Sequence, residues 1–307
     1  MAGNVVPMRK AAMTLGVSVE RFLSGSDFTP ATRRVYETTF SVLVADLGPE
    51  ADLAKITTEQ IEAHLAGRYR HAASTYNRNR ATVRSLFEWA VRKRMVSDNP
   101  VDPIDRRKER TTEIERRRSQ VMTYDDLKRI WSGREVSLRE KTYWNLLYDT
   151  AARANEALNL NVEDLDLDER QARIVGKGGD AQTIHWATPT ARLLPRLVGN
   201  RTAGPLFLTE RRSGHEVALG DREAESGRAR LSYRRAAELF KQASNGRTLH
   251  EIRHARVTHL IQDGADLALV KAKSRHSTLR SLERYIHPTE RDVAQLTARH
   301  DPERRRR

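Results

Sequence analysis

The amino-acid sequence predicts a mainly α-helical protein with a small antiparallel β-sheet, divided into an all-α N-terminal domain and an α+β domain. Apolar residues recur at helical spacing through most of the chain, and two strand-like segments flank a glycine-rich turn. A basic stretch with few apolar residues separates the two regions. At 307 residues, the chain is long enough for about two domains.

Three helices are expected in the N-terminal domain. Thr29 can cap a helix whose first turn contains Pro30 and whose apolar stripe ends before Gly48. Thr57 and Gln60 form a capping box at the start of the second helix. The third begins near Ser74, and we expect Asn99-Pro100 to stop it.

The second domain begins with helices and continues with strands. Thr123 can cap its first helix, and Ser137 with Glu140 forms a capping box for the next. Strands are expected over residues 171–175 and 182–186, and the polar segment 210–230 is expected to be a surface loop. Several short helices follow, from Leu231 to about Arg299.

These signals divide the chain into an N-terminal extension, a helical domain, a linker and a second domain. The linker is strongly basic, which is typical of a segment that contacts a polyanion or remains solvated. The expected bounds of the four parts are residues 1–16, 17–102, 103–120 and 121–307.

Charge points to a polyanionic partner. Lys and Arg number 55 against 41 Asp and Glu, so the formal net charge is +14. The chain has no cysteine, which excludes disulfides, thiol nucleophiles and cysteine-ligated zinc. Because no apolar run is long enough to cross a bilayer and no signal peptide is evident, we expect a cytoplasmic protein without membrane contact.

Five features carry residues suited to chemistry on a phosphate. Each alone has an ordinary structural explanation: an ion pair one helical turn apart, a lysine in a solvated turn, or a core tyrosine. Their order along the chain is what makes them informative. The features are Arg153 with Glu156, Lys177 in a glycine-rich hairpin, His250 with Arg253 on one helix face, His276, and Tyr285.

This ordered set resembles that of the tyrosine recombinases, the family of phage integrases and Xer-type resolving enzymes. The resemblance covers nearly the whole chain, since the N-terminal helices are similar to the family's core-binding domain and the second domain to a catalytic domain of the DNA breaking-rejoining type. Gly176-Lys177-Gly178 resembles the family's hairpin lysine motif, and the run from Leu249 to Tyr285 resembles its C-terminal signature.

The resemblance implies a site-specific recombinase that forms a 3′-phosphotyrosine intermediate without metal, ATP or another cofactor. Tyr285 would be the nucleophile, and Arg153 and Arg253 would clamp the phosphate, since guanidinium groups offer paired donors and stay charged. Lys177 would protonate the departing 5′ oxygen. The remaining roles would be acid/base chemistry for His250, a phosphate hydrogen bond for His276 and orientation of a site residue for Glu156.

Two motifs depart from the family pattern, and both changes replace a glycine. The arginine motif usually reads Thr-Gly-Leu-Arg, but here it is Thr150-Ala151-Ala152-Arg153. The histidine usually follows Leu-Gly, but here Ser274-Arg275 precede His276. The chemical side chains remain, and Arg275 is expected to contact a phosphate.

Double-stranded DNA is the expected partner, bound by a homo-tetramer on paired sites and by a monomer or weak oligomer in the free state. The residues expected to bind DNA are Arg78, Arg80, Arg84, Arg106, Arg107, Lys108 and Arg275.

Three alternatives remain open. His250-Glu251 and His254 match the His-Glu-x-x-His pattern of zinc hydrolases, although no third ligand follows at a familiar spacing. A regulator could bind DNA through the same fold without catalysis. A type IB topoisomerase shares the tyrosine chemistry without pairing two sites.

Overall fold

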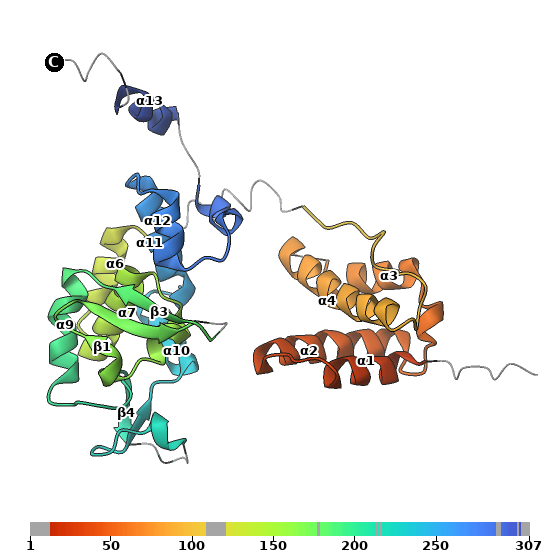
Figure 1. Cartoon of the computed structure of the whole chain (residues 1–307), viewed down its shortest axis with the longest axis horizontal. Helices are drawn as coiled ribbons and strands as arrows, with labels where there is room; N and C mark the ends of the chain where they lie inside the picture. Colours follow the sequence, from red (N-terminus) through yellow and green to blue (C-terminus); the bar gives the residue numbers. More distant parts are fainter. Residues whose placement is uncertain are drawn as a thin grey trace, which may run out of the picture. The chain divides into compact units, whose positions relative to one another are not determined.

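The computed structural model describes residues 13–70, 72–108, 121–176, 179–212, 214, 217–286, 290–299 and 301. The chain divides between Arg117 and Arg118 into two compact units, each with its own hydrophobic core (Figure 1). None of the helices described is both long enough and apolar enough to span a membrane. The predicted fold class is confirmed: both units are mostly helical, and small antiparallel sheets occur in the second.

The N-terminal unit is built from helices whose ends follow the predicted capping signals. Thr29 accepts a hydrogen bond from the Thr32 N–H, and the Thr57–Gln60 capping box is present. A first helix, which the sequence did not reveal, is capped by Thr14. The elements are α1 (Leu15–Ser24), α2 (Pro30–Leu47), the 3₁₀ turn η1 (Leu53–Lys55), α3 (Thr58–Arg68) and α4 (Ala73–Arg92).

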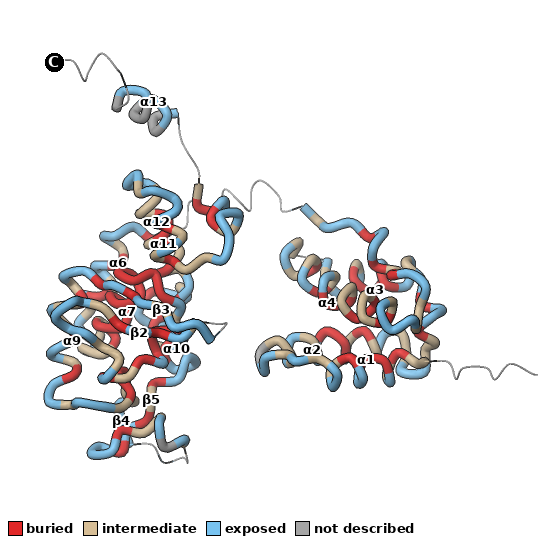
Figure 2. Tube along the Cα trace, viewed as in Figure 1, coloured by how far each residue is buried: buried red, intermediate tan, exposed pale blue. Residues whose placement is uncertain are grey.

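The core of this unit is rich in aromatic rings. Phe22 lies with its ring centroid 5.8 Å from that of Phe40 and 5.7 Å from that of Trp89, both in edge-on geometry. In Figure 2 the buried residues run along the facing sides of α1, α2, α3 and α4, while the outer sides are exposed.

Two predicted boundaries of the N-terminal domain are wrong. Leu15 and Gly16 belong to α1, so the extension does not reach residue 16. Ile104 is buried in the core of this unit, and the Arg107 N–H donates to Asn77 at 2.9 Å. The first part of the expected linker is therefore packed against the helices. In addition, α4 ends at Arg92, before Asn99-Pro100.

The second unit contains the larger core and the predicted strands. Its helical elements are α6 (Tyr124–Trp131), α7 (Leu138–Thr150), α8 (Ala154–Leu158), η2 (Val162–Asp164), α9 (Thr188–Val198), η3 (Leu219–Asp221), α10 (Tyr233–Ala243), α11 (Leu249–Gln262), α12 (Leu267–Ser274), η4 (Leu279–Tyr285) and α13 (Glu290–Arg299). Its strands are β1 (Leu165–Asp166), β2 (Gln171–Val175), β3 (Ala181–His185), β4 (Leu208–Arg212) and β5 (Arg228–Arg230).

Helix α7 lies at the centre of this unit. Every residue from Thr142 to Thr150 is buried, as expected for a helix that is surrounded on all sides rather than on one face. It contacts α6, α9, α10 and α11 as well as β3 (Figure 1). The predicted Ser137–Glu140 capping box fixes its start. A rigid central helix gives the residues at its C-terminal end a fixed position.

The three-stranded sheet presents a hairpin at one end. The strand order is β1-β2-β3, antiparallel throughout, and the last pair of β2 and β3 joins Val175 to Ala181. The Gly176 N–H donates to the Asp180 carbonyl at 2.9 Å, which closes the turn. Lys177 follows Gly176 and lies outside the described residues.

The expected surface loop at 210–230 is in part a two-stranded ribbon. Strands β4 and β5 pair in antiparallel fashion, and Arg230 ties the ribbon to the unit by donating to the Leu158 and Leu160 carbonyls at 2.9 and 3.0 Å. The strands have no alternating apolar pattern, because most of their residues are exposed or half-buried. Sequence periodicity therefore missed them.

Candidate active site

The site begins where α7 ends. Ala151 adopts left-handed backbone geometry, with φ 50° and ψ 30°, and so terminates the helix. The Thr150 hydroxyl stabilises the turn, donating to the Leu146 carbonyl at 2.6 Å and accepting from the Ala152 N–H at 3.1 Å. The chain then enters α8 with Arg153 as its N-cap residue. Ala151 stands where the family pattern has a glycine.

Arg153 and Glu156 form the predicted pair. The guanidinium donates to Glu156 Oε1 at 2.6 Å, and the Arg153 backbone N–H donates to Oε2 at 2.8 Å. Burial raises the pKa of Glu156, but these hydrogen bonds and the charge of Arg275 outweigh it, so the pKa lies below its usual value. The side chain of Arg153 remains 47% exposed, which leaves it accessible to a ligand.

Arg253 is buried in α11 and joins the ends of two other helices. Its Nη1 donates to the Ala151 carbonyl at the end of α7, and its Nη2 donates to the Ser274 carbonyl at the end of α12, 2.6 Å away. A cation at helix C-termini is favoured by the helix dipoles. Burial and the charges of Arg153 and Arg275 lower the pKa of Arg253 to about 10, so it remains protonated at neutral pH.

His276 follows α12 and is held by Ser274. The Ser274 hydroxyl donates to the Val270 carbonyl at 2.6 Å, and it lies 2.6 Å from His276 Nδ1. A hydroxyl has one proton to donate, so His276 Nδ1 must be the donor to Ser274. Nε2 of the neutral ring is then an acceptor. His276 can donate to a phosphate from Nε2 only as the imidazolium.

Tyr285, the last residue of η4, lies against two histidines. Its ring centroid is 4.7 Å from that of His254 and 5.9 Å from that of His276. The residue is 3% exposed and packs in a small apolar cluster with Ala151, Val257, Val270 and Leu282.

The remaining predicted residues are His250, Lys177 and Arg275. His250 is exposed in the first turn of α11, one turn before Arg253. Lys177 is outside the described residues. The expectation for Arg275 is wrong: its side chain is 7% exposed, and it binds Glu156 and backbone carbonyls inside the unit.

Three of the arginines expected to bind DNA are engaged within the N-terminal unit. Arg80 donates to the Ile104 and Val101 carbonyls, and Arg84 is paired with Glu88 and Asp102. The Arg107 guanidinium carbon lies 3.8 Å from the centroid of the Tyr76 ring. These arginines hold the segment after α4 against the helix.

Arg78, Arg106 and Lys108 are exposed. Arg106 borders a hollow of about 550 Å³ whose other lining residues are Asn77, Arg80, Ala81, Arg84 and Asp102. Basic groups around a surface hollow are suited to phosphate contact.

Sequence reasoning missed two residues of the site. His254 was considered only as a zinc ligand, yet it contacts Tyr285. Ser274 was not considered, yet its hydroxyl sets the tautomer of His276 and its carbonyl binds Arg253. The position of His254, beside Arg253 in the sequence, was the available signal. For Ser274 no signal pointed to the contact with Arg253, because that residue lies in another helix.

The geometry does not favour the zinc hydrolase. Glu251 caps α11 through the Thr248 N–H at 2.6 Å and pairs with Arg247 at 3.0 Å. Over the described part of the chain, no three His, Asp or Glu side chains are grouped so that they could hold a metal ion.

Both units match known family models. Residues 120–291 match the phage integrase family, and residues 20–94 match the phage integrase N-terminal SAM-like domain. The chain therefore belongs to the phage integrase family and is a tyrosine-type site-specific recombinase.

Curated relatives and solved structures agree with this assignment. The chain is 30% identical over 285 residues to the tyrosine recombinase XerC of Mycobacterium sp. (strain KMS), covering 88% of this chain and 91% of the relative. It is 31% identical over 288 residues to XerC of Mycobacterium tuberculosis (strain ATCC 25177 / H37Ra), with the same two coverages.

The fold is similar to those of two integrases solved with DNA. One is the Tn1549 transposon integrase in complex with a circular intermediate DNA, with a TM-score of 0.70, 16% identity, and coverage of 94% of this chain and 99% of that one. The other is a lambda integrase tetramer bound to a Holliday junction, with a TM-score of 0.68, 17% identity, and coverage of 87% and 78%.

Proposed function

We propose that this recombinase cleaves and rejoins double-stranded DNA through a 3′-phosphotyrosine formed on Tyr285. The observation that carries the proposal is the site itself: Arg153 donates to the Arg275 carbonyl, Arg253 donates to the adjacent Ser274 carbonyl, and the Tyr285 ring lies against His276. This arrangement occurs in a chain that belongs to the phage integrase family.

In the proposed reaction, the Tyr285 oxygen attacks the phosphorus and the bond from phosphorus to the 5′ oxygen breaks. The phenol loses its proton and the departing 5′ oxygen gains one, so the products are a 3′-phosphotyrosine and a 5′-hydroxyl. Attack by a 5′-hydroxyl on the phosphotyrosine reverses the step and rejoins the strand. Because the phosphotyrosine ester retains the bond energy of the broken phosphodiester, rejoining needs no ATP.

Two arginines stabilise the negative charge that develops in the proposed transition state. Negative charge grows on the nonbridging oxygens, and fixed guanidinium groups stabilise it without rearrangement. Arg153 is the exposed member of the pair. Arg253 is the buried member, fixed by the ends of α7 and α12.

Proton transfer is assigned to the neighbouring bases. Lys177, which lies between β2 and β3 in the sequence, is proposed to protonate the 5′ oxygen, and His250 to accept or return the phenolic proton. His276 binds the phosphate as an imidazolium, because its Nδ1 proton is directed to Ser274. Since Tyr285 is 3% exposed, a shift of η4 must deliver its oxygen to the phosphate.

The partner is proposed to be duplex DNA, with a homo-tetramer on paired sites and a monomer or weak oligomer in the free state. The lambda integrase tetramer on a Holliday junction supports the first part. We also place the protein in the cytoplasm, because cellular DNA would be its substrate.

The test of this function uses DNA that the protein itself selects. Duplexes trapped on wild-type protein from a fragmented DNA library are sequenced, and the recovered site is prepared as a nicked duplex that releases a short fragment after cleavage. We expect a covalent protein–DNA adduct in excess EDTA and without nucleotide. If the adduct forms only when a divalent metal is added, this mechanism is wrong.

Binding is expected to weaken steeply with salt. If about six phosphates are neutralised, the affinity should fall roughly 10³-fold between about 50 and about 200 mM salt. The double substitution Arg106→Gln/Lys108→Gln should reduce the slope by about 2, because each removes one phosphate contact. Fluorescence anisotropy with the recovered duplex measures both values.

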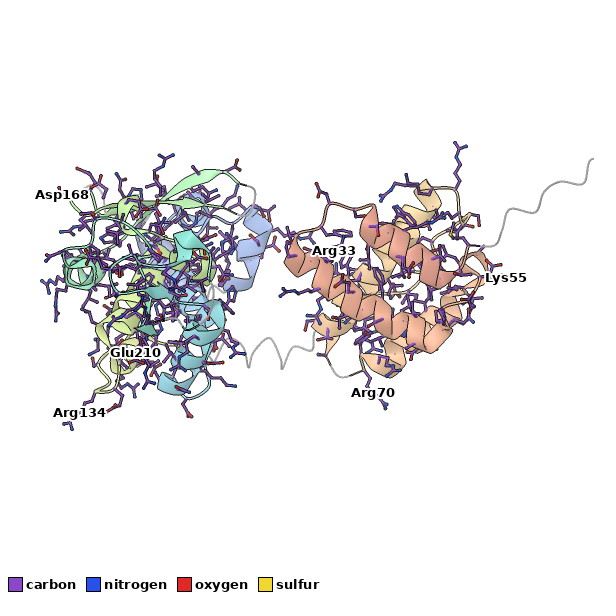
Figure 3. All side chains as sticks on the ribbon, turned by 90° about the horizontal axis from the view of Figure 1, so that it is seen from below. Arg33, Lys55, Arg70, Arg134, Asp168 and Glu210 are labelled. Atoms are coloured by element: carbon purple, nitrogen blue, oxygen red, sulfur yellow. The ribbon has the colours of Figure 1, made fainter. Side chains whose placement is uncertain are left out.

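The control for this measurement is Lys55→Gln. Lys55 is exposed in the same unit (Figure 3) and pairs with Asp52 at 3.8 Å. This variant should keep the wild-type slope. Identical slopes for the control and the double variant would remove Arg106 and Lys108 from the proposed DNA interface.

A further inference from the structure

A third arginine, Arg275, lies inside the candidate site without being exposed to a ligand. Its side chain is 7% exposed, compared with 47% for Arg153. Its Nη2 donates to Glu156 Oε2 at 3.1 Å, while Arg153 donates to the other carboxylate oxygen. The single carboxylate of Glu156 is therefore shared by two guanidinium groups, and Arg275 fixes it from the interior side.

Arg275 also fixes the turns that hold Arg253. Its Nη1 donates to the Lys273 carbonyl at 2.8 Å, and its Nη2 donates to the Ala151 carbonyl at 3.3 Å. The same Ala151 carbonyl accepts from Arg253. In addition, the Arg275 carbonyl accepts a hydrogen bond from Arg153 Nη2 at 3.4 Å. Each proposed phosphate-binding arginine thus shares a partner with Arg275.

Backbone geometry does not explain an arginine at this position. Arg275 has φ 55° and ψ 41°, and this left-handed conformation favours glycine or asparagine. Ala151, its contact across the site, has φ 50°. Arginine is strained where a glycine would not be. The hydrogen bonds of its guanidinium therefore offset a conformational strain that a glycine at this position would not have.

We propose that Arg275 is a positioning residue for DNA cleavage, which orients Arg153 through Glu156 and Arg253 through the Ala151 carbonyl. This inference rests on the proposed function, in which those two arginines bind the phosphate. Its guanidinium donates to Glu156 and to the Lys273 and Ala151 carbonyls, so we expect its effect to fall on the cleavage rate rather than on DNA affinity.

The experiment replaces Arg275 with residues that suit its backbone. Arg275→Gly and Arg275→Asn remove the guanidinium and relieve the left-handed strain, so thermal stability should be unchanged or higher. With protein in saturating excess over the nicked duplex, we expect the rate of adduct formation to fall roughly 10- to 100-fold, since one charge-assisted hydrogen bond is lost. DNA affinity should not change. Arg275→Lys should recover part of the rate, because an ammonium can still bind Glu156.

The matched control is Arg134→Asn, which removes an exposed arginine at the edge of the same unit (Figure 3). Wild-type cleavage rates in Arg275→Gly and Arg275→Asn would overturn the inference while leaving the proposed function intact. A rate loss matched by a loss of thermal stability would assign Arg275 a structural role instead. If wild-type protein forms no adduct, the proposed function fails, and this inference fails with it.

Discussion

Tyr285→Phe is expected to abolish the covalent protein–DNA adduct and to leave DNA binding intact. Phenylalanine keeps the ring that packs between Ala151, Val257, Val270 and Leu282 but lacks the nucleophilic oxygen. Unfolding free energy should change by only about 1 kcal/mol, the usual net value of one hydroxyl hydrogen bond. Denaturing gel electrophoresis of protein incubated with the nicked duplex measures the adduct, and fluorescence anisotropy measures binding.

Tyr233→Phe is the control for this loss. Tyr233, at the start of α10, is 49% exposed and lies outside the candidate site. Its variant should form the adduct at the wild-type rate. An adduct that persists in Tyr285→Phe would mean that another residue is the nucleophile.

Arg253→Ala should produce the second largest effect, on both activity and stability. Removal of one fixed donor from a site that stabilises developing negative charge lowers the rate by about 10² to 10³-fold. The Ser274 carbonyl loses the Arg253 donor, and a buried acceptor without a partner costs roughly 1 to 3 kcal/mol. Single-turnover cleavage and urea unfolding of the full chain test the two parts.

Arg253→Lys separates charge from geometry. Lysine retains the cation, but one ammonium group is less suited than a guanidinium to hold the Ala151 and Ser274 carbonyls together. We expect partial recovery of stability with little recovery of cleavage. A rate for Arg253→Ala close to wild type would exclude Arg253 from transition-state stabilisation.

Local signals in the sequence predicted most of the helices. The capping boxes at Thr57–Gln60 and Ser137–Glu140 involve residues three apart, so the sequence alone contains the whole interaction. The β4–β5 ribbon was missed because its stability depends on Arg230 and carbonyls about 70 residues away. Helix α1 begins inside the segment predicted to be an extension, because a threonine such as Thr14 does not by itself distinguish a helix start from a loop.

The sequence predicted which residues the candidate site contains, but it did not predict the hydrogen bonds between them. Arg153, Arg253, His276 and Tyr285 were identified from their order and their resemblance to a family signature. The bonds that position them join residues far apart in sequence, as from Arg275 to Glu156 or from Arg253 to Ala151. No local pattern shows that Arg275 points inward. The sequence therefore predicted a phosphate contact for Arg275, whereas in the fold its side chain is buried and binds Glu156 and backbone carbonyls.

Two helix ends of the candidate site have a left-handed residue where the family pattern has a glycine. Ala151 and Arg275 both keep positive φ, so the helices end where the family pattern places a glycine. Their carbonyl-rich ends are stabilised by guanidinium donors instead of by relaxed backbone.

The most direct test of the mechanism is to identify the bond in the trapped adduct. Wild-type protein is trapped on the nicked duplex and digested with protease and nuclease, and the nucleotide-bearing peptide is sequenced by mass spectrometry. We expect a 3′-linked nucleotide on the oxygen of Tyr285 and on no other residue. A nucleotide on any other side chain, or a linkage through a 5′ phosphate, would contradict the proposed mechanism.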